Sequence, residues 1–188
     1  MPASPAQPIA DRPAEPGDAA SDDPLSSNEP DASSGIDVDV DPALTLPAGE
    51  VAWLADRLAA AVAHLGLGDA RIGLALLADA EMTRLHEAYK QQPGPTDVLT
   101  FDLREPDAAD GPLDGDIAIG WQEAERRANE LGHPARHEAL LYAVHGLMHL
   151  IGEDDATPEQ AERMHRREDG VLEAIGVGAV YRRDGGAS

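Results

Sequence analysis

The sequence predicts an α+β fold: a small mixed four-stranded β-sheet packed against about five helices. Two observations point to it. Some segments alternate apolar and polar residues, as half-buried strands do, whereas others repeat apolar residues every three or four positions, as amphipathic helices do. The two kinds of segment are also interspersed along the chain, which favours one sheet covered by helices over two separate layers.

The first half of the predicted domain contains two strands and two helices. Residues 36–40 alternate, which indicates a strand, and 48–65 carry apolar residues at helical spacing, with Gly66 as a stop signal. Residues 72–76 alternate again and form the second expected strand. Asp79 is of a residue type that caps helices, so we expect it to be the N-cap of a helix that reaches Lys90.

The second half adds two strands and three helices. Residues 98–103 and 116–119 are predicted strands, and a helix over 121–131 ends at Gly132. The most apolar segment is expected to be a buried helix over 135–151. A last helix begins after Thr157, where a threonine, a proline and a glutamine have the spacing of a capping box, and reaches about residue 175.

Composition divides the chain into three parts. The 188 residues include 36 acidic and 14 basic ones and no cysteine, for a net charge of −22. Residues 1–34 carry seven prolines and seven acids with few large apolar side chains, so we expect a disordered extension there. Residues 35–180 are expected to form a single domain, and 181–188 a flexible tail. The chain has neither a signal peptide pattern nor a membrane-spanning run, so we expect a cytoplasmic protein without a membrane partner.

The absence of cysteine restricts any metal site to histidine and carboxylate ligands, and the helix over 135–151 offers such a set. His145 and His149 are four residues apart, so their side chains share one face. Gly152 can end the helix and let the chain fold back, which brings Asp155 toward the same point. Two histidines and a carboxylate form a known catalytic zinc set. Asp154 and His165 are alternative third ligands, and two structural histidines in a buried helix are the non-functional alternative.

Two further residues stand out. Glu168 lies in the apolar stripe of the last helix, four residues from both Met164 and Leu172. A carboxylate there can accept a proton from a metal-binding histidine, or it can lie at the edge of the stripe and reach water. Lys90 is the only lysine and follows Tyr89 at the end of a predicted helix. Taken alone, Lys90 is expected to be an exposed cation at the C-terminus of a helix.

Together these segments resemble the YbeY-type endoribonucleases, a bacterial family associated with rRNA maturation. Tyr89-Lys90 followed by Pro95–Phe101 is similar to one family block, Gly115–Ile117 to its Gly-Asp-Ile strand, and His145–Asp155 to its metal motif. Met164 and Glu168 match a downstream methionine and glutamate. The resemblance covers about residues 35–176. It departs at three positions, where Asp155 replaces a histidine, Lys90 an arginine and Glu153 a tyrosine.

The resemblance implies a metal-dependent hydrolase that cuts single-stranded RNA in the maturation of the small-subunit rRNA 3′ end and in ribosome quality control. His145, His149 and Asp155 would bind one Zn²⁺ per chain, Glu168 would orient a histidine, and Lys90 and His145 would act in catalysis. An aspartate ligand favours a harder metal than a histidine does, so another divalent cation is an alternative. The expected partners are single-stranded RNA and the small ribosomal subunit, and not DNA.

Two rival functions follow from the same residues. The ligand spacing is that of metzincin peptidases, so the predicted fold includes a metzincin-like metal-binding helix. The glutamate base of those peptidases is replaced by Gly146, which argues against peptide hydrolysis. The second rival is a non-catalytic ribosome assembly factor with a structural metal. The acidic net charge suits RNA binding only if arginines cluster locally, and the candidates are Arg57, Arg84, Arg104, Arg126, Arg127 and Arg136.

Overall fold

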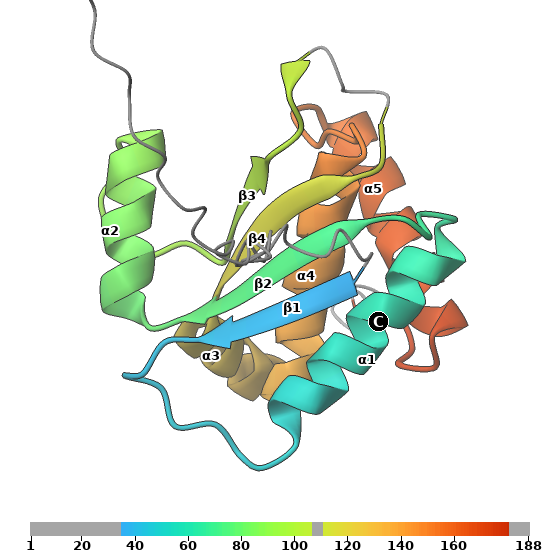
Figure 1. Ribbon diagram of the computed structural model, residues 1–188. Coiled ribbons are helices and arrows are strands. Elements are labelled where there is room, and N and C mark those ends of the chain that lie inside the picture. The colour runs from blue at the N-terminus through green and yellow to red at the C-terminus, as the bar shows by residue number, and fades with distance from the viewer. Residues whose placement is uncertain (1–34, 107–110, 181–188) are drawn as a thin grey trace, which may run out of the picture. The chain divides into compact units, whose positions relative to one another are not determined.

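The computed structural model describes residues 35–106 and 111–180, which contain a four-stranded mixed sheet (Figure 1). The strands are β1 (Gly35–Val40), β2 (Arg71–Leu77), β3 (Val98–Asp102) and β4 (Asp114–Gly120), in the order β1-β2-β4-β3. β1, β2 and β4 are parallel, and β3 runs antiparallel to β4 at the edge. The expected mixed sheet is confirmed.

Five helices lie in the described part of the chain: α1 (Glu50–His64), α2 (Asp79–Lys90), α3 (Trp121–Leu131), α4 (Ala135–Leu150) and α5 (Pro158–Ala174). In Figure 1, α1, α4 and α5 lie on one side of the sheet and α2 on the other. Burial follows this arrangement. Leu74 of β2 and Ile117 of β4 are paired in register and face the larger core with α4, whereas Ala118 packs against Met82 of α2. The expected α+β fold is therefore confirmed.

The sequence signals at helix ends are mostly confirmed. Gly66, Gly132 and Gly152 follow α1, α3 and α4 with positive φ angles of 75°, 73° and 88°, as glycines that end helices do. The capping box of α5 is present, since the Thr157 side chain accepts from the amide of Gln160 at 3.2 Å and the Gln160 side chain accepts from the amide of Thr157 at 3.0 Å.

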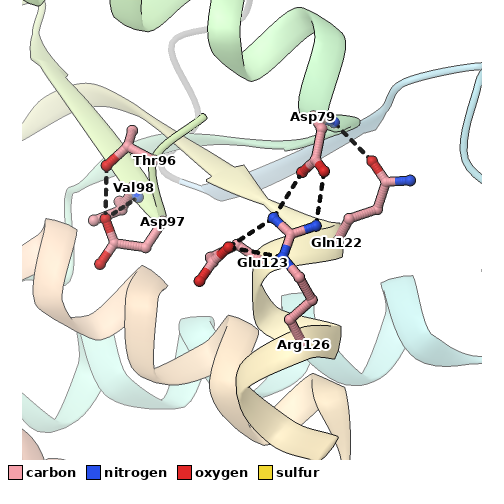
Figure 2. Close-up of polar contacts among 7 residues, drawn as sticks. All are labelled: Asp79, Thr96, Asp97, Val98, Gln122, Glu123 and Arg126. Atoms are coloured by element: carbon pink, nitrogen blue, oxygen red, sulfur yellow. Dashed lines mark hydrogen bonds and ion pairs between the residues drawn. The ribbon is translucent and has the colours of Figure 1, made fainter. Parts of the chain in front are cut away.

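The prediction that Asp79 caps α2 is wrong. Ala78 occupies the N-cap position, and Asp79 is the first helical residue. Its carboxylate is held instead by Arg126 of α3 at 2.7 Å, and its amide donates to the Gln122 side chain at 2.7 Å (Figure 2). Glu123 binds the same guanidinium at 2.6 Å. A guanidinium from a helix distant in sequence thus takes the carboxylate that local capping would use.

The helix α4 approaches the sheet most closely at Gly146. A Cβ atom at that position would lie 2.9 Å from side-chain carbons of both Ile117 and Thr100, so the position accommodates only hydrogen. α4 therefore lies directly against β3 and β4. Because β3 is the edge strand, α4, the helix that carries His145 and His149, lies toward this edge of the sheet.

The expected extension (1–34) and tail (181–188) fall outside the described residues, so the division into extension, domain and tail stays a prediction. Among the helices that the structure describes, none is long and apolar enough to cross a membrane.

Candidate metal centre

Two imidazole rings from α4 converge at one point. His145 and His149 stand edge to face, with ring centroids 4.6 Å apart, and their Nε2 atoms are separated by 3.0 Å. Two nitrogen ligands of a tetrahedral zinc ion lie about 3.3 Å apart, given Zn–N bonds of about 2.05 Å. The helical spacing of the two histidines has therefore placed both nitrogens at the separation that one metal ion requires.

The other nitrogen of each ring is already occupied. Nδ1 of His145 lies 2.8 Å from Oε1 of Glu168, and Nδ1 of His149 lies 3.1 Å from the backbone oxygen of Glu153. Both partners are acceptors, so each Nδ1 carries a proton and each neutral ring presents the lone pair of Nε2. Two lone pairs 3.0 Å apart repel each other unless a cation lies between them. This donor set fits a divalent metal ion.

A carboxylate completes the cluster. Oδ2 of Asp155 lies 3.9 Å from Nε2 of His145, and Oδ1 lies 3.8 Å from Nε2 of His149. The three ligand atoms lie within 4.8 Å of one another, and no other such group of three was found in the part of the chain that the structure describes. Asp154 instead accepts from the amide of Asp155 at 2.9 Å. The geometry thus brings Asp155 to the histidines, and not Asp154 or His165.

Negative charge gathers around the two rings. Burial by itself lowers the pKa of His145, but the hydrogen bond and charge of Glu168, together with the charge of Asp155, leave the pKa raised above its ordinary value of 6.5. Glu168 is fully buried, and its Oε2 atom has no hydrogen-bond partner within the described residues. An electrostatic environment that stabilises positive charge on His145 also favours a bound metal cation.

The chain is similar to proteins of one family. The family model of Endoribonuclease YbeY matches residues 49–176. An Endoribonuclease YbeY from Anaeromyxobacter sp. (strain Fw109-5) is 38% identical over 133 residues, which cover 71% of this chain and 69% of that protein. Another, from Moorella thermoacetica, is 37% identical over 127 residues, covering 63% and 81%.

The chain belongs to the Endoribonuclease YbeY family. A solved structure agrees with this assignment: the solution structure of TM1509 from Thermotoga maritima aligns with a TM-score of 0.55 at 25% identity and covers 74% of this chain and 88% of its own. The relatives are named endoribonucleases, which are hydrolases acting on RNA phosphodiester bonds.

The third departure from the YbeY pattern, Glu153, connects the metal centre to α5. Its backbone oxygen faces His149, as described above, and its side chain pairs with Arg167 of α5. The ion pair ties the loop that carries Asp155 to the helix that carries Glu168. The sequence could not indicate that Glu153 supports the metal centre, because the contact with His149 is made by its backbone oxygen and not by its side chain.

A second support of the centre comes from β3. Arg104, just after this strand, donates to the backbone oxygen of Leu150 at 2.9 Å and pairs with Asp102 at 2.6 Å. It therefore satisfies a carbonyl at the C-terminal end of α4, next to His149. Sequence reasoning placed Arg104 only among arginines that might cluster, because nothing local indicates a contact across 46 residues.

Lys90 lies apart from the metal cluster. It is the last residue of α2, exposed, on the face of the sheet opposite α4. Tyr89 beside it is 63% exposed and contacts Phe101 of β3 edge to face, with centroids 4.8 Å apart. An RNA strand that touches both Lys90 and the histidines would have to cross the β3 edge.

The arginines considered for RNA binding do not form one cluster. Arg84 pairs with Glu81 on α2, and Arg126 bridges α2 and α3. Arg127 pairs with Glu130 on its own helix. The remaining three contact elements distant in sequence: Arg57 donates to the backbone oxygen of Ile175, Arg104 to that of Leu150, and Arg136 lies 3.8 Å from Glu50. Most of these guanidinium groups are thus engaged by acidic side chains.

Proposed function

We propose that this chain is a metal-dependent endoribonuclease that cuts single-stranded RNA and acts in the cytoplasm in maturation of the small-subunit rRNA 3′ end and in ribosome quality control. One observation carries the proposal: two Nε2 atoms and a carboxylate converge while each Nδ1 atom is held by an acceptor. Family membership supplies the substrate class, since the matched relatives are endoribonucleases. The small ribosomal subunit is the partner that this role implies.

His145, His149 and Asp155 would hold the metal ion. Zinc fits two imidazole nitrogens and a carboxylate, and the harder aspartate oxygen makes another divalent cation the alternative. When bound, such an ion polarises a phosphoryl oxygen and makes water more acidic. Three protein ligands leave room in a tetrahedral site for one more group, which is the arrangement of catalytic rather than structural zinc sites.

The remaining residues would orient the reactants. Glu168 keeps the His145 ring in one orientation and one tautomer, so Nε2 stays available without rearrangement. Lys90 would bring a positive charge to the phosphate as negative charge builds up on it during cleavage. Because Lys90 ends α2 on the other side of β3, it would act on RNA that lies across the strand edge.

The packing of Gly146 weighs against the peptidase alternative. The general base of metzincin peptidases is a glutamate directly after the first histidine, and here that position faces Ile117 and Thr100 with no space for even a Cβ atom. A side chain cannot be added there without moving α4 away from the sheet. The assembly-factor alternative differs from the proposal only in turnover, so the experiment decides between them.

The test compares cleavage of a single-stranded RNA with that of the same sequence in a duplex, using the full chain with and without zinc. Asp155→Ala, purified identically, controls for contaminating nucleases. We expect zinc-dependent cleavage of the single strand by the unmodified chain and at least a hundredfold less by the variant. Intact RNA in the presence of bound zinc would overturn the proposal and favour the assembly role.

A further inference from the structure

A polar cavity lies against α4, the helix that carries both histidines. It has a volume of about 390 Å³ and is lined by the residues just before β3, by α3, by the N-terminal half of α4 and by Val180. Its polar lining residues are Thr96, Asp97, Glu123, Arg127, Glu138 and Tyr142. None of the metal candidates is among them, so the cavity is a separate compartment.

The cavity and the metal centre share one face of α4. Glu138, Tyr142, His145 and His149 follow one another at intervals of four, three and four residues, which is the spacing of a single helical face. Tyr142 precedes His145 by three residues, or about 4.5 Å along the helix axis. A nucleotide whose phosphate lies at the histidines therefore has its base or ribose within reach of the cavity.

The cavity presents hydrogen-bond acceptors. Oδ1 of Asp97 accepts from the Thr96 hydroxyl at 2.9 Å and from the Val98 amide at 2.8 Å (Figure 2). Its other oxygen has no hydrogen-bond partner among residues 35–106 and 111–180. Asp97 is exposed, so this oxygen can bind an incoming group. Glu123 differs, because Arg126 already holds its Oε2 atom at 2.6 Å.

The charge of the cavity decides which part of a nucleotide it can take. Three carboxylates and one guanidinium line it, and that guanidinium, of Arg127, is 3.2 Å from Glu130. A phosphate would be repelled, whereas a neutral base with N–H donors would be attracted. Tyr142 stays protonated, because its burial and the nearby charges of Glu138 and Asp97 raise its pKa.

We propose that this cavity is a base-binding subsite for guanine next to the cleaved phosphate, with Asp97 as the residue that determines specificity. The inference rests on the proposed function, since it places the phosphate at the metal centre. Guanine is the RNA base with two adjacent donors, N1–H and N2–H, on its Watson–Crick edge, and the oxygen of Asp97 that has no partner among the described residues can accept from both donors. Uracil offers a single donor between two carbonyls and fits an acceptor-rich wall poorly.

The first experiment sequences the products of a randomised single-stranded RNA cut by the zinc-loaded full chain. Guanine should be enriched several-fold at one position next to the cut. Asp97→Asn keeps the shape and the acceptor for Val98 but turns an N–H donor toward the cavity, so the guanine-to-uracil ratio should fall about tenfold. Asp56→Asn, an exposed aspartate of α1 outside the cavity, makes the same chemical change and should keep the ratio.

The second experiment is independent of cleavage: guanosine 5′-monophosphate and uridine 5′-monophosphate are titrated onto the full chain by calorimetry. GMP should bind at least fivefold more tightly than UMP, and Asp97→Asn should remove the difference. If RNA is cut without base preference and both nucleotides bind equally, the subsite is overturned while the nuclease function stands. If RNA is not cut but GMP is still preferred, the nuclease function fails and the cavity is a guanine-binding site without a cleaved phosphate beside it.

Discussion

Oε1 of the fully buried Glu168 lies 2.8 Å from Nδ1 of His145, a residue 23 positions earlier in the chain. The contact joins α5 to α4 and fixes which ring nitrogen faces Asp155. It also places a negative charge in the core, where His145 and any cation it binds are the available counter-charge. Glu168 therefore links the packing of the last helix to the metal centre.

Removing the charge of Glu168 should weaken metal binding. We expect Glu168→Gln to lower zinc affinity 10- to 100-fold, because the amide no longer fixes the basicity and tautomer of His145 as the carboxylate does. Competition with a fluorescent zinc chelator measures the effect. Glu162→Gln, an exposed position on the same helix, is the matched control. Equal affinities for both variants and the parent chain would contradict the assigned role.

Asp155 should be needed for tight metal binding, and Asp154 should not. Asp155→Ala removes one of three ligand candidates, so we expect at least a tenfold loss of zinc affinity and loss of RNA cleavage. Asp154→Ala is the neighbouring control and should bind zinc normally. Asp155→His restores the residue found in the family pattern and should retain zinc. Full zinc content in Asp155→Ala would show that another group completes the site.

Adding a methyl group at Gly146 should destabilise the fold. In Gly146→Ala the new carbon would meet Ile117 and Thr100 at 2.9 Å, and such overpacking costs about 1–3 kcal/mol of unfolding free energy. Gly170→Ala on α5 meets nothing within 4 Å and should be neutral or stabilise by up to about 1 kcal/mol. Urea unfolding at an unchanged m-value measures both. Equal stability of the two variants would mean that α4 can move from the sheet without cost.

Lys90 should affect turnover without affecting the metal. Because it lies on the opposite side of β3 from the histidines, we expect Lys90→Ala to retain full zinc content and lose about 10- to 100-fold in RNA cleavage. Lys90→Arg keeps the charge and should keep activity. Arg84→Ala, on the same helix and paired with Glu81, is the control. Unchanged cleavage in Lys90→Ala would remove this residue from the mechanism.

Zinc binding should weaken as the pH falls through the raised pKa of His145. A metal ligand must be neutral, so protons compete with zinc, and the affinity should drop about tenfold for each pH unit below this pKa. The stability of the metal-free chain changes with pH in the opposite direction, because it falls as the pH rises. A pKa that folding raises stabilises the fold below the ordinary value of 6.5, and this contribution is lost as pH rises through the folded pKa.

Affinity titrations between pH 5.5 and 8.5 test the first effect, and unfolding of metal-free protein over the same range tests the second. Glu168→Gln should shift both curves to lower pH, because it removes the carboxylate that raises the pKa of His145. Curves that coincide with those of the parent chain would mean that another group controls the titration.

Local sequence patterns predicted most of the fold, because most helices and strands form from interactions between residues close together in the chain. Alternation placed β1 and β2, and the Thr157 box placed the start of α5, since each depends on residues within a few positions. The same logic failed at Asp79. Its carboxylate binds Arg126, 47 residues away, and no local pattern reports such a partner.

The parts of the candidate site that depend on local spacing were likewise predictable from the sequence. The spacing of His145 and His149 and the glycine turn brought three ligand candidates together, and Glu168 was visible as an acid in an apolar stripe. The cavity beside Tyr142 was not predictable, because it is assembled from elements separated in the chain. Nor could the sequence show that Lys90 and the histidines lie on opposite sides of β3.

The central position of α4 has a consequence for biosynthesis. Eleven of its sixteen residues are buried, and it contacts α1, α3, α5, β3 and β4. β2 likewise pairs with β4, whose residues are 114–120. During translation residues 35–102 therefore emerge before the segments of the chain that pack against them. The nascent N-terminal half should stay sensitive to protease until residue 150 has left the ribosomal exit tunnel.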